Sequence, residues 1–167
     1  MAIFKWHNGE VPSGIKVTQV YGVIFTKDGR TLLKVEEKSD GRKVYSLAGG
    51  TPEDFDLDRE ATLRRELIEE VNTTIEKPVL VGYQEVDEEN GKEAYAQVRM
   101  TALIDKIGEI KPDPDNGETY QRLLTSPSRA IELLNWGEVG KTLITQAFKI
   151  AKKEFNLVNF NDLEEFV

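Results

Sequence analysis

The sequence predicts an α/β protein built as a single domain, residues 1–167. Two observations predict this class. Several short segments rich in β-branched and aromatic residues are separated by turns that contain Gly, Asn or Asp, which is typical of strands. Other segments carry helix-capping residues or place apolar residues at helical spacing. A chain of 167 residues is also long enough to bury most of its apolar surface in one core.

The first half of the chain is predicted to be mostly strand. Residues 1–16 contain two glycines and a proline and show no clear period, so we expect an arm or a short strand at the edge of the domain, anchored by Trp6. Two turns with an Asp-Gly pair follow, and the segments around them have the pattern of strands. The predicted strands are residues 16–25, 31–36 and 43–47. The third of them leads into a glycine pair.

The second half combines helices with further strands. Its predicted elements are a helix over residues 60–71, a hairpin of strands 79–86 and 93–104 around Asn90-Gly91, a last strand over 118–125, and helices over 127–134 and 139–155. Residues 105–117 form a loop long enough to have a function. The tail, residues 156–167, is acidic and carries Phe160, Leu163 and Phe166, and it would pack on the domain or on a partner.

Composition excludes several classes of protein. There are no cysteines, so disulfides, thiol nucleophiles and zinc–cysteine sites are excluded. No segment approaches the roughly 20 apolar residues of a membrane span, and the first residues lack a signal-peptide core, so we expect a cytoplasmic protein. The net charge of −8 argues against binding a nucleic acid polymer through its phosphates. The only histidine, His7, lies in the irregular arm, which argues against a histidine-based triad.

The predicted helix over residues 60–71 contains the run Arg65-Glu66-Leu67-Ile68-Glu69-Glu70. Its three glutamates stand at i, i+3 and i+4, so their carboxylates project from one face within a turn and repel one another. Divalent cations would neutralise them, and oxygen-only ligands favour Mg²⁺ or Mn²⁺. Arg65 is one turn before Glu69 and could hold a carboxylate in a fixed rotamer. The alternative is an exposed helix face with ordinary salt bridges.

The glycine pair Gly49-Gly50 precedes this helix by a short loop, and the whole arrangement resembles the Nudix box. The pattern of that box is G-x5-E-x7-R-E-U-x-E-E-x-G-U, where U is aliphatic, and the resemblance covers residues 49–73. Counted from Gly50, Arg65 arrives one residue late, which implies a one-residue insertion in the loop.

Three other departures from the pattern concern single positions. Asp56 or Asp58 would stand in for the first acid of the box. Asn72 replaces the closing glycine, and Asn is the next most willing residue to enter the left-handed region that ends a helix. Thr73 replaces the last aliphatic residue. The glutamates that bind metal in the family are all present.

The resemblance implies the Nudix fold, an α/β/α sandwich with a mixed β-sheet. It also implies a site in which a glycine carbonyl and the box glutamates bind Mg²⁺ or Mn²⁺, an arginine orients a glutamate, and a carboxylate outside the box completes the site or acts as the base. The implied metal ligands are Gly49, Glu66, Glu69 and Glu70, and the implied catalytic residues are Arg65, Glu66, Glu69 and Glu118. For the outside carboxylate, Asp113, Asp115 and Glu85 are alternatives to Glu118, which could equally be an exposed acid at the end of a strand.

The activity implied by the resemblance is hydrolysis of the diphosphate linkage of a nucleoside diphosphate derivative by a metal-activated water. A nucleoside triphosphate or a modified nucleotide is the favoured substrate, and a homodimer is possible. One alternative is a nucleotide-sensing module without turnover, and another is a partner-binding protein that uses the last helix and the tail. Basic and aromatic side chains before the box could contact a phosphate or a base, although exposed strand faces and core packing explain them as well; they include Lys34, Lys38, Arg42, Lys43 and Tyr21.

Overall fold

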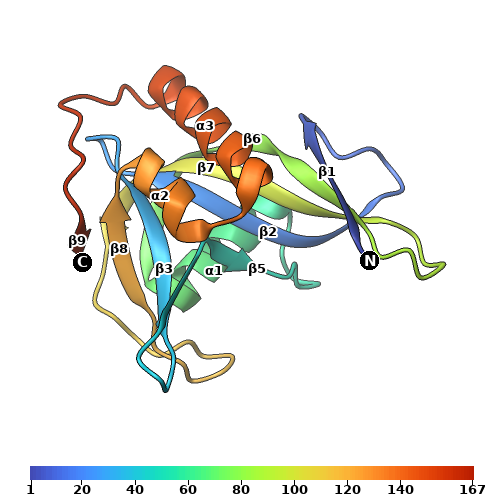
Figure 1. The fold of residues 1–167 in the computed structure, drawn as a ribbon, viewed down its shortest axis with the longest axis horizontal. Helices are drawn as coiled ribbons and strands as arrows, with labels where there is room; N and C mark the ends of the chain where they lie inside the picture. Colours follow the sequence, from blue (N-terminus) through green and yellow to red (C-terminus); the bar gives the residue numbers. More distant parts are fainter.

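The computed structural model describes residues 1–167 and shows one mixed sheet between helices (Figure 1). The helix α1 (Arg59–Val71) covers one face, while α2 (Pro127–Leu134) and α3 (Gly137–Glu154) cover the other. The strands are β1 (Ile3–Asn8), β2 (Lys16–Phe25), β3 (Thr31–Glu37), β4 (Lys43–Ser46), β5 (Ala48–Gly50), β6 (Thr73–Asp87), β7 (Tyr95–Ile107), β8 (Gln121–Thr125) and β9 (Glu165–Phe166). This is the predicted α/β/α sandwich.

The strand order is β1-β6-β7-β2-β3-β8-β9, with β4 attached to β3 and β5 attached to β2. All pairings are antiparallel except that between β2 and β7, which makes the sheet mixed. Each face has its own apolar core. In β2, Val20 and Ile24 face α1, whereas Val23 and Phe25 face α2 and α3, as the period of two along a strand requires.

The sheet forks beside β2, and the fork positions the glycine pair. The middle of β2 pairs with β5, where Tyr21 lies opposite Gly49, but only Phe25 at its end pairs with β3, opposite Thr31. From Lys34 onward β3 pairs with β4 instead. The two halves of the sheet therefore separate on this side of β2, and the Gly49-Gly50 pair lies at the separation.

Local capping signals explain where the helices begin and end. The Asp58 side chain accepts a hydrogen bond from the Ala61 N–H at the start of α1. Asn72 ends this helix in the left-handed region with φ 45° and ψ 51°, which confirms the interpretation of the missing glycine. Ser126 and Pro127 begin α2 as N-cap and first helical residue, also as predicted.

Several strand limits differ from the prediction. Strand β6 begins at Thr73, directly after α1, and continues past Pro78 because the register shifts there and Lys77 adopts a positive φ of 51°. Strand β7 extends to Ile107 rather than 104. Strand β8 begins at Gln121, so the predicted start at residue 118 was wrong. The predicted strand over residues 43–47 corresponds to β4, and the glycine pair that follows it belongs to a further short strand, β5.

Both chain ends pack on the domain. The N-terminal arm forms β1 at the β6 edge, and the Trp6 indole donates to Gln146 of α3 at 3.2 Å, so its anchoring role is confirmed. At the opposite edge β9 pairs with β8, and Glu165 forms an ion pair with Arg30 at 2.9 Å. The tail therefore packs on the domain through main-chain and polar contacts, whereas its apolar side chains Phe160, Leu163 and Phe166 are 51–70% exposed. No helix combines the length and hydrophobicity that crossing a membrane requires.

Candidate active site

The box glutamates lie against the glycine pair of β5. The Gly49 N–H donates to Glu70 Oε1 at 2.8 Å. Gly50 stands so close to Glu66 that a Cβ at this position would overlap the carboxylate. Both glutamates are buried, although each carries a charged group. The glycine pair therefore lets α1 bring two carboxylates directly beneath the strand.

Arg65 connects the helix glutamates Glu66 and Glu69 with Asp56 in the loop before the helix. Its Nη1 donates to Glu66 Oε1 at 2.9 Å and to Glu69 Oε2 at 3.2 Å. Its Nε and Nη2 donate to the two oxygens of Asp56 at 3.1 and 2.9 Å, and Nη2 also reaches the Thr51 carbonyl at 3.0 Å. This bidentate contact holds the pKa of the Asp56 carboxyl well below its usual range.

Asp56 therefore occupies the place of the missing box acid, and the alternative, Asp58, serves as the N-cap of α1. Thr62 adds a hydrogen bond to Asp56 at 2.9 Å. Although the loop is one residue longer than the pattern, it still places the Asp56 carboxylate within hydrogen-bonding distance of Arg65.

The negative charge of the box glutamates and Asp56 exceeds the positive charge of the two cations paired with them, Arg65 and Lys34. Burial raises the pKa of Glu66; Arg65 opposes this shift, while Glu70 and Glu69 add to it. Burial also raises the pKa of Glu69, against the effect of Arg65, and two aspartates outside the box contribute. The Lys34 ammonium from β3 pairs with Glu70. The site thus favours additional positive charge.

The acids outside the box that reach it are Asp113 and Asp115. With Glu69 they form a group in which each residue offers a carboxylate oxygen within 4.8 Å of the others. Glu118, the favoured candidate from the sequence, is exposed and lies outside this group; its carbonyl accepts from the Asp113 N–H at 2.7 Å. Glu85 pairs with His7 at 2.8 Å. The outside carboxylates in position are therefore the two aspartates of the loop before β8.

These residues fit a divalent cation of the Mg²⁺ type. The group of Glu69, Asp113 and Asp115 offers only oxygen donors, and burial raises the pKa of Glu69, as it does for the neighbouring Glu66. A cation bound there would offset both the burial of these carboxylates and their mutual repulsion. The N–H of Gly49 contacts Glu70, whereas metal binding by its carbonyl stays a prediction.

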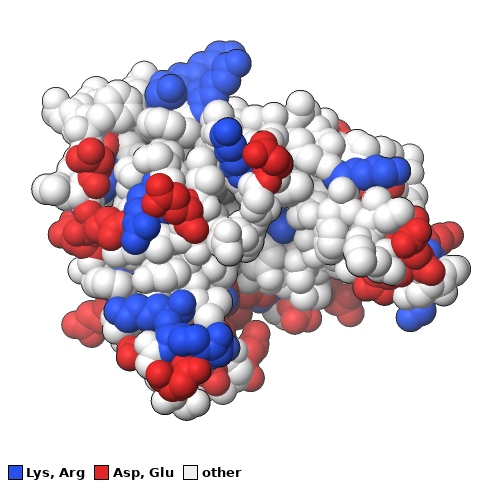
Figure 2. Space-filling model, in the orientation of Figure 1, with Lys and Arg blue, Asp and Glu red and all other residues white.

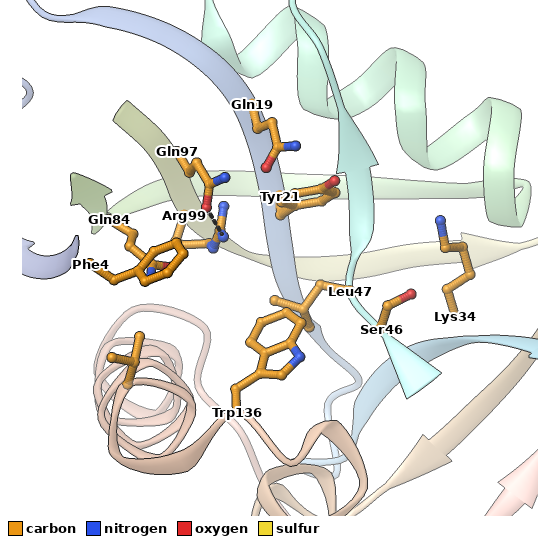
Figure 3. A pocket seen from close by; sticks show the side chains of 11 residues that line it. Phe4, Gln19, Tyr21, Lys34, Ser46, Leu47, Gln84, Gln97, Arg99 and Trp136 are labelled. Carbon is orange, nitrogen blue, oxygen red and sulfur yellow. Dashed lines mark hydrogen bonds between the residues drawn. The ribbon is translucent and has the colours of Figure 1, made fainter. Parts of the chain in front are cut away.

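A pocket of about 530 Å³ opens beside the glycine pair, at the fork of the sheet. Figure 2 shows a hollow near the connection between α2 and α3, surrounded mostly by uncharged surface. Figure 3 shows Tyr21 and Lys34 on the side of the pocket toward α1, and Trp136 entering from the α2–α3 connection. The lining residues are Phe4, Gln19, Tyr21, Lys34, Ser46, Leu47, Gln84, Gln97, Arg99, Trp136 and Val139.

Sequence reasoning found only part of this pocket. Lys34 and Tyr21 were candidates, but the glutamines, Arg99 and Trp136 were not. The available signal was the charge of Arg99 inside the apolar run of β7, between the buried residues Val98 and Met100. A buried charge in a strand is unusual unless it has a partner or a function.

Comparison with known families identifies the class of the protein. A family model described as the NUDIX domain matches residues 16–146, which span β2 to most of α3. The chain belongs to the NUDIX family. It is accordingly a hydrolase that acts on pyrophosphate bonds, and the box glutamates and the fold are consistent with this class.

Solved structures with similar folds are distant in sequence. The pyrophosphohydrolase BsRppH of Bacillus subtilis is 18% identical with a TM-score of 0.64, covering 91% of this chain and 92% of its own. A NUDIX hydrolase of Listeria monocytogenes is 19% identical with a TM-score of 0.60, covering 83% and 96%. MutT of Bacillus halodurans is 18% identical with a TM-score of 0.56, covering 78% and 80%. Among curated proteins no match was found.

Proposed function

We propose that this protein is a divalent-metal-dependent hydrolase that cleaves the diphosphate linkage of a nucleoside diphosphate derivative, with water as the nucleophile. The observation that carries the proposal is the position of Glu66 and Glu70 against the glycine pair, with Glu69 linked to Glu66 through Arg65. A pocket of a size suited to a nucleotide opens beside them. The contact between the Gly49 N–H and Glu70 supports Gly49 as a member of the same site.

The residues of the chain have separate roles in this proposal. The three box glutamates, with Gly49, would hold Mg²⁺ or Mn²⁺, and Asp113 and Asp115 would complete the ligand set beside Glu69. The bound cation would neutralise the diphosphate and lower the pKa of an attacking water. Arg65 positions Glu66 and Glu69 through its hydrogen bonds to both, and Asp56 holds Arg65 in place.

A carboxylate outside the box would act as the base. Asp113 and Asp115 lie within reach of Glu69, which supports them in this role, whereas a catalytic role for Glu118 would require the loop before β8 to rearrange.

The pocket supports a nucleotide as the substrate. Phe4 and Trp136 supply aromatic surface for a base, and the pocket volume of about 530 Å³ falls within the range of roughly 300–1,000 Å³ that is usual for small ligands. Similarity to proteins named pyrophosphohydrolase and MutT supports a nucleoside triphosphate or a modified nucleotide. A cytoplasmic location and a homodimer stay predictions.

The test is release of phosphate and pyrophosphate from a panel of nucleoside diphosphate derivatives with Mg²⁺ or Mn²⁺. Glu69→Gln and Glu70→Gln should each lower the rate by about a hundredfold or more, because each removes a charged ligand. Glu93→Gln is the matched control, since Glu93 is exposed in the β6–β7 turn. Wild-type turnover that persists in chelator, or that survives both substitutions, would reject the proposal.

One observation favours the second candidate function, nucleotide sensing without turnover. Lys34 already supplies a positive charge to Glu70. If the lysine replaced a metal, wild type would bind nucleotides without hydrolysing any member of the panel. In that case calorimetry would detect nucleotide binding that does not depend on a divalent cation.

A further inference from the structure

Arg99 is a buried charge without a carboxylate partner. It lies in the middle of β7, between Tyr21 of β2 and Gly82 of β6, and only 5% of the residue is exposed. Its Nη2 donates to Gln97 Oε1 at 3.1 Å and its Nη1 to the Val98 carbonyl at 3.3 Å. The guanidinium also lies over the Tyr21 ring, 4.9 Å from its centroid. None of these partners carries a negative charge.

The two other buried arginines are compensated more fully. Arg30 forms ion pairs with Asp28 and Glu165. Arg122 donates to three main-chain carbonyls at 2.7–3.0 Å, with none of its bonds as long as the 3.3 Å contact of Arg99. Burial lowers the pKa of Arg99 to about 10, so the group is still charged at neutral pH. Burying a charge in this way lowers the stability of the fold unless a group of opposite charge pairs with it.

The surroundings of Arg99 suit a negatively charged partner. No Asp or Glu lines the pocket, although the whole chain carries a net charge of −8. Two lining residues are cationic, and one of them, Lys34, is already paired with Glu70. Figure 3 shows the guanidinium among Phe4, Gln97 and Tyr21, inside the pocket. Arg99 is therefore the cation that remains available to a ligand.

The sheet register sets the distance between Arg99 and the box. Gly49 pairs with Tyr21, and Tyr21 pairs on its other side with Arg99. Neighbouring strands lie about 4.8 Å apart, so the backbone of Arg99 is about 10 Å from the glycine pair. The guanidinium lies over the Tyr21 ring, which packs on the face of the sheet that α2 and α3 cover, whereas the box glutamates come from α1 on the other face. A group held by Arg99 would therefore be a different part of the substrate from the diphosphate held at the box.

We propose that Arg99 forms an anion subsite, so that the preferred substrate is a nucleoside diphosphate derivative with a second anionic oxygen group, a phosphate or a carboxylate, away from the bond that is cleaved. The planar guanidinium matches both groups through paired N–H donors. The guanidinium is positioned by its hydrogen bond to Gln97 and by stacking over the Tyr21 ring. This inference rests on the proposed function for the position of the diphosphate.

The test uses pairs of compounds that differ mainly in the anionic group. NADP⁺ and NAD⁺ differ by a phosphate, and UDP-glucuronate and UDP-glucose differ by a carboxylate. Binding is measured by calorimetry with Ca²⁺ in place of the catalytic cation, and kcat/KM is measured separately with Mg²⁺. Because binding is measured on its own, the subsite can stand even where the hydrolase proposal fails.

In at least one pair, wild type should bind the member with the anionic group about tenfold to a hundredfold more tightly. Arg99→Gln should bring that ratio within about twofold, and Arg99→Lys, which keeps the charge, should retain part of it. The exposed Arg42 gives the control Arg42→Gln, which should leave the ratio unchanged. The pair that shows the preference identifies the group as phosphate or carboxylate.

Three results would overturn the inference. The first is equal binding of both members of both pairs by wild type. The second is a preference that persists in Arg99→Gln when thermal unfolding shows that the variant is folded. The third is that Arg99→Gln changes only the choice between GTP and ATP, which would assign the guanidinium to the edge of a base rather than to an anion.

Discussion

Arg65 is the residue through which the loop before α1 reaches the box glutamates. Its guanidinium contacts carboxylates that stand nine residues before it, one residue after it and one helical turn after it. The side chain of Arg65 is only 16% exposed and that of Asp56 only 5%, so their pair is shielded from water. Positioning of the glutamates therefore depends on the acid in the loop as much as on the helix.

Asp56→Asn should lower the free energy of unfolding at pH 7 by about 1–2 kcal/mol, because it replaces a charge-assisted bidentate contact by a neutral one. Arg65 holds the pKa of Asp56 below its ordinary value of 3.8. A lowered pKa contributes stability that is present above about pH 4 and is lost as the pH falls further. The difference between wild type and variant in urea unfolding should therefore be largest at pH 7 and clearly smaller at pH 2.

The control for this prediction is Asp58→Asn. Asn is as good an N-cap as Asp, so this variant should unfold almost as wild type does at both pH values. An Asp56→Asn difference that stays the same at pH 2 and pH 7 would show that the ion pair with Arg65 is not its cause.

At the scale of elements, α1 is held at both ends by side chains that are local in sequence. Asp58 caps its first turn, and Asn72 leaves its last turn with a positive φ. The Asn72 Nδ2 also donates to the Glu109 carbonyl at 2.8 Å, and the Asn72 carbonyl accepts from the Gly108 N–H at 2.8 Å. The C-cap thereby ties the helix to the loop that carries Asp113.

Asn72→Ala should lower the free energy of unfolding by about 1–3 kcal/mol, since Ala is disfavoured in the left-handed region and the bond to Glu109 is lost. Asn72→Gly loses the same bond but adopts the conformation freely, so its loss should be clearly smaller. Chemical denaturation of the three proteins measures the order. Equal losses for Gly and Ala would assign the whole effect to the side-chain hydrogen bond.

At the scale of the whole molecule, the tail closes one edge of the sheet. Strand β9 covers β8, Glu165 pairs with Arg30, and the Val167 carbonyl accepts from Arg122 at 3.0 Å. Strand β1 covers the other edge by pairing with β6. Both ends of the chain thus protect strand edges that would otherwise expose unpaired N–H and carbonyl groups.

Deletion of residues 159–167 should lower the midpoint of thermal unfolding, because β8 loses its neighbour and two buried arginines lose partners. A loss of about 1–3 kcal/mol is expected. Hydrolysis at 25 °C should persist, since no tail residue lines the pocket or contacts a box glutamate. Calorimetry and the phosphate-release assay check the two parts. Loss of activity in a folded, truncated protein would place the tail in the site.

Much of the fold could be predicted because its signals are local. The three helices and most strands were predicted within a few residues, and the caps at Asp58, Asn72 and Ser126 explain the helix ends. The extensions of β6 and β7 were missed because the two strands pair over a longer stretch than their local patterns indicate, and in β6 the pairing continues across the break expected at Pro78. The start of β8 was misplaced because residues 118–120 belong to the acidic loop.

The sequence by itself determined the class of the fold and the glutamates of the box, because a helix places residues three and four apart on one face wherever it packs. Only the tertiary structure decided which other residues join them. Asp113 reaches Glu69 from a distant loop, and Lys34 reaches Glu70 from β3, while strand pairing places Arg99 of β7 beside Tyr21 in the neighbouring pocket. Such pairings join residues far apart in the chain, so no local pattern records them.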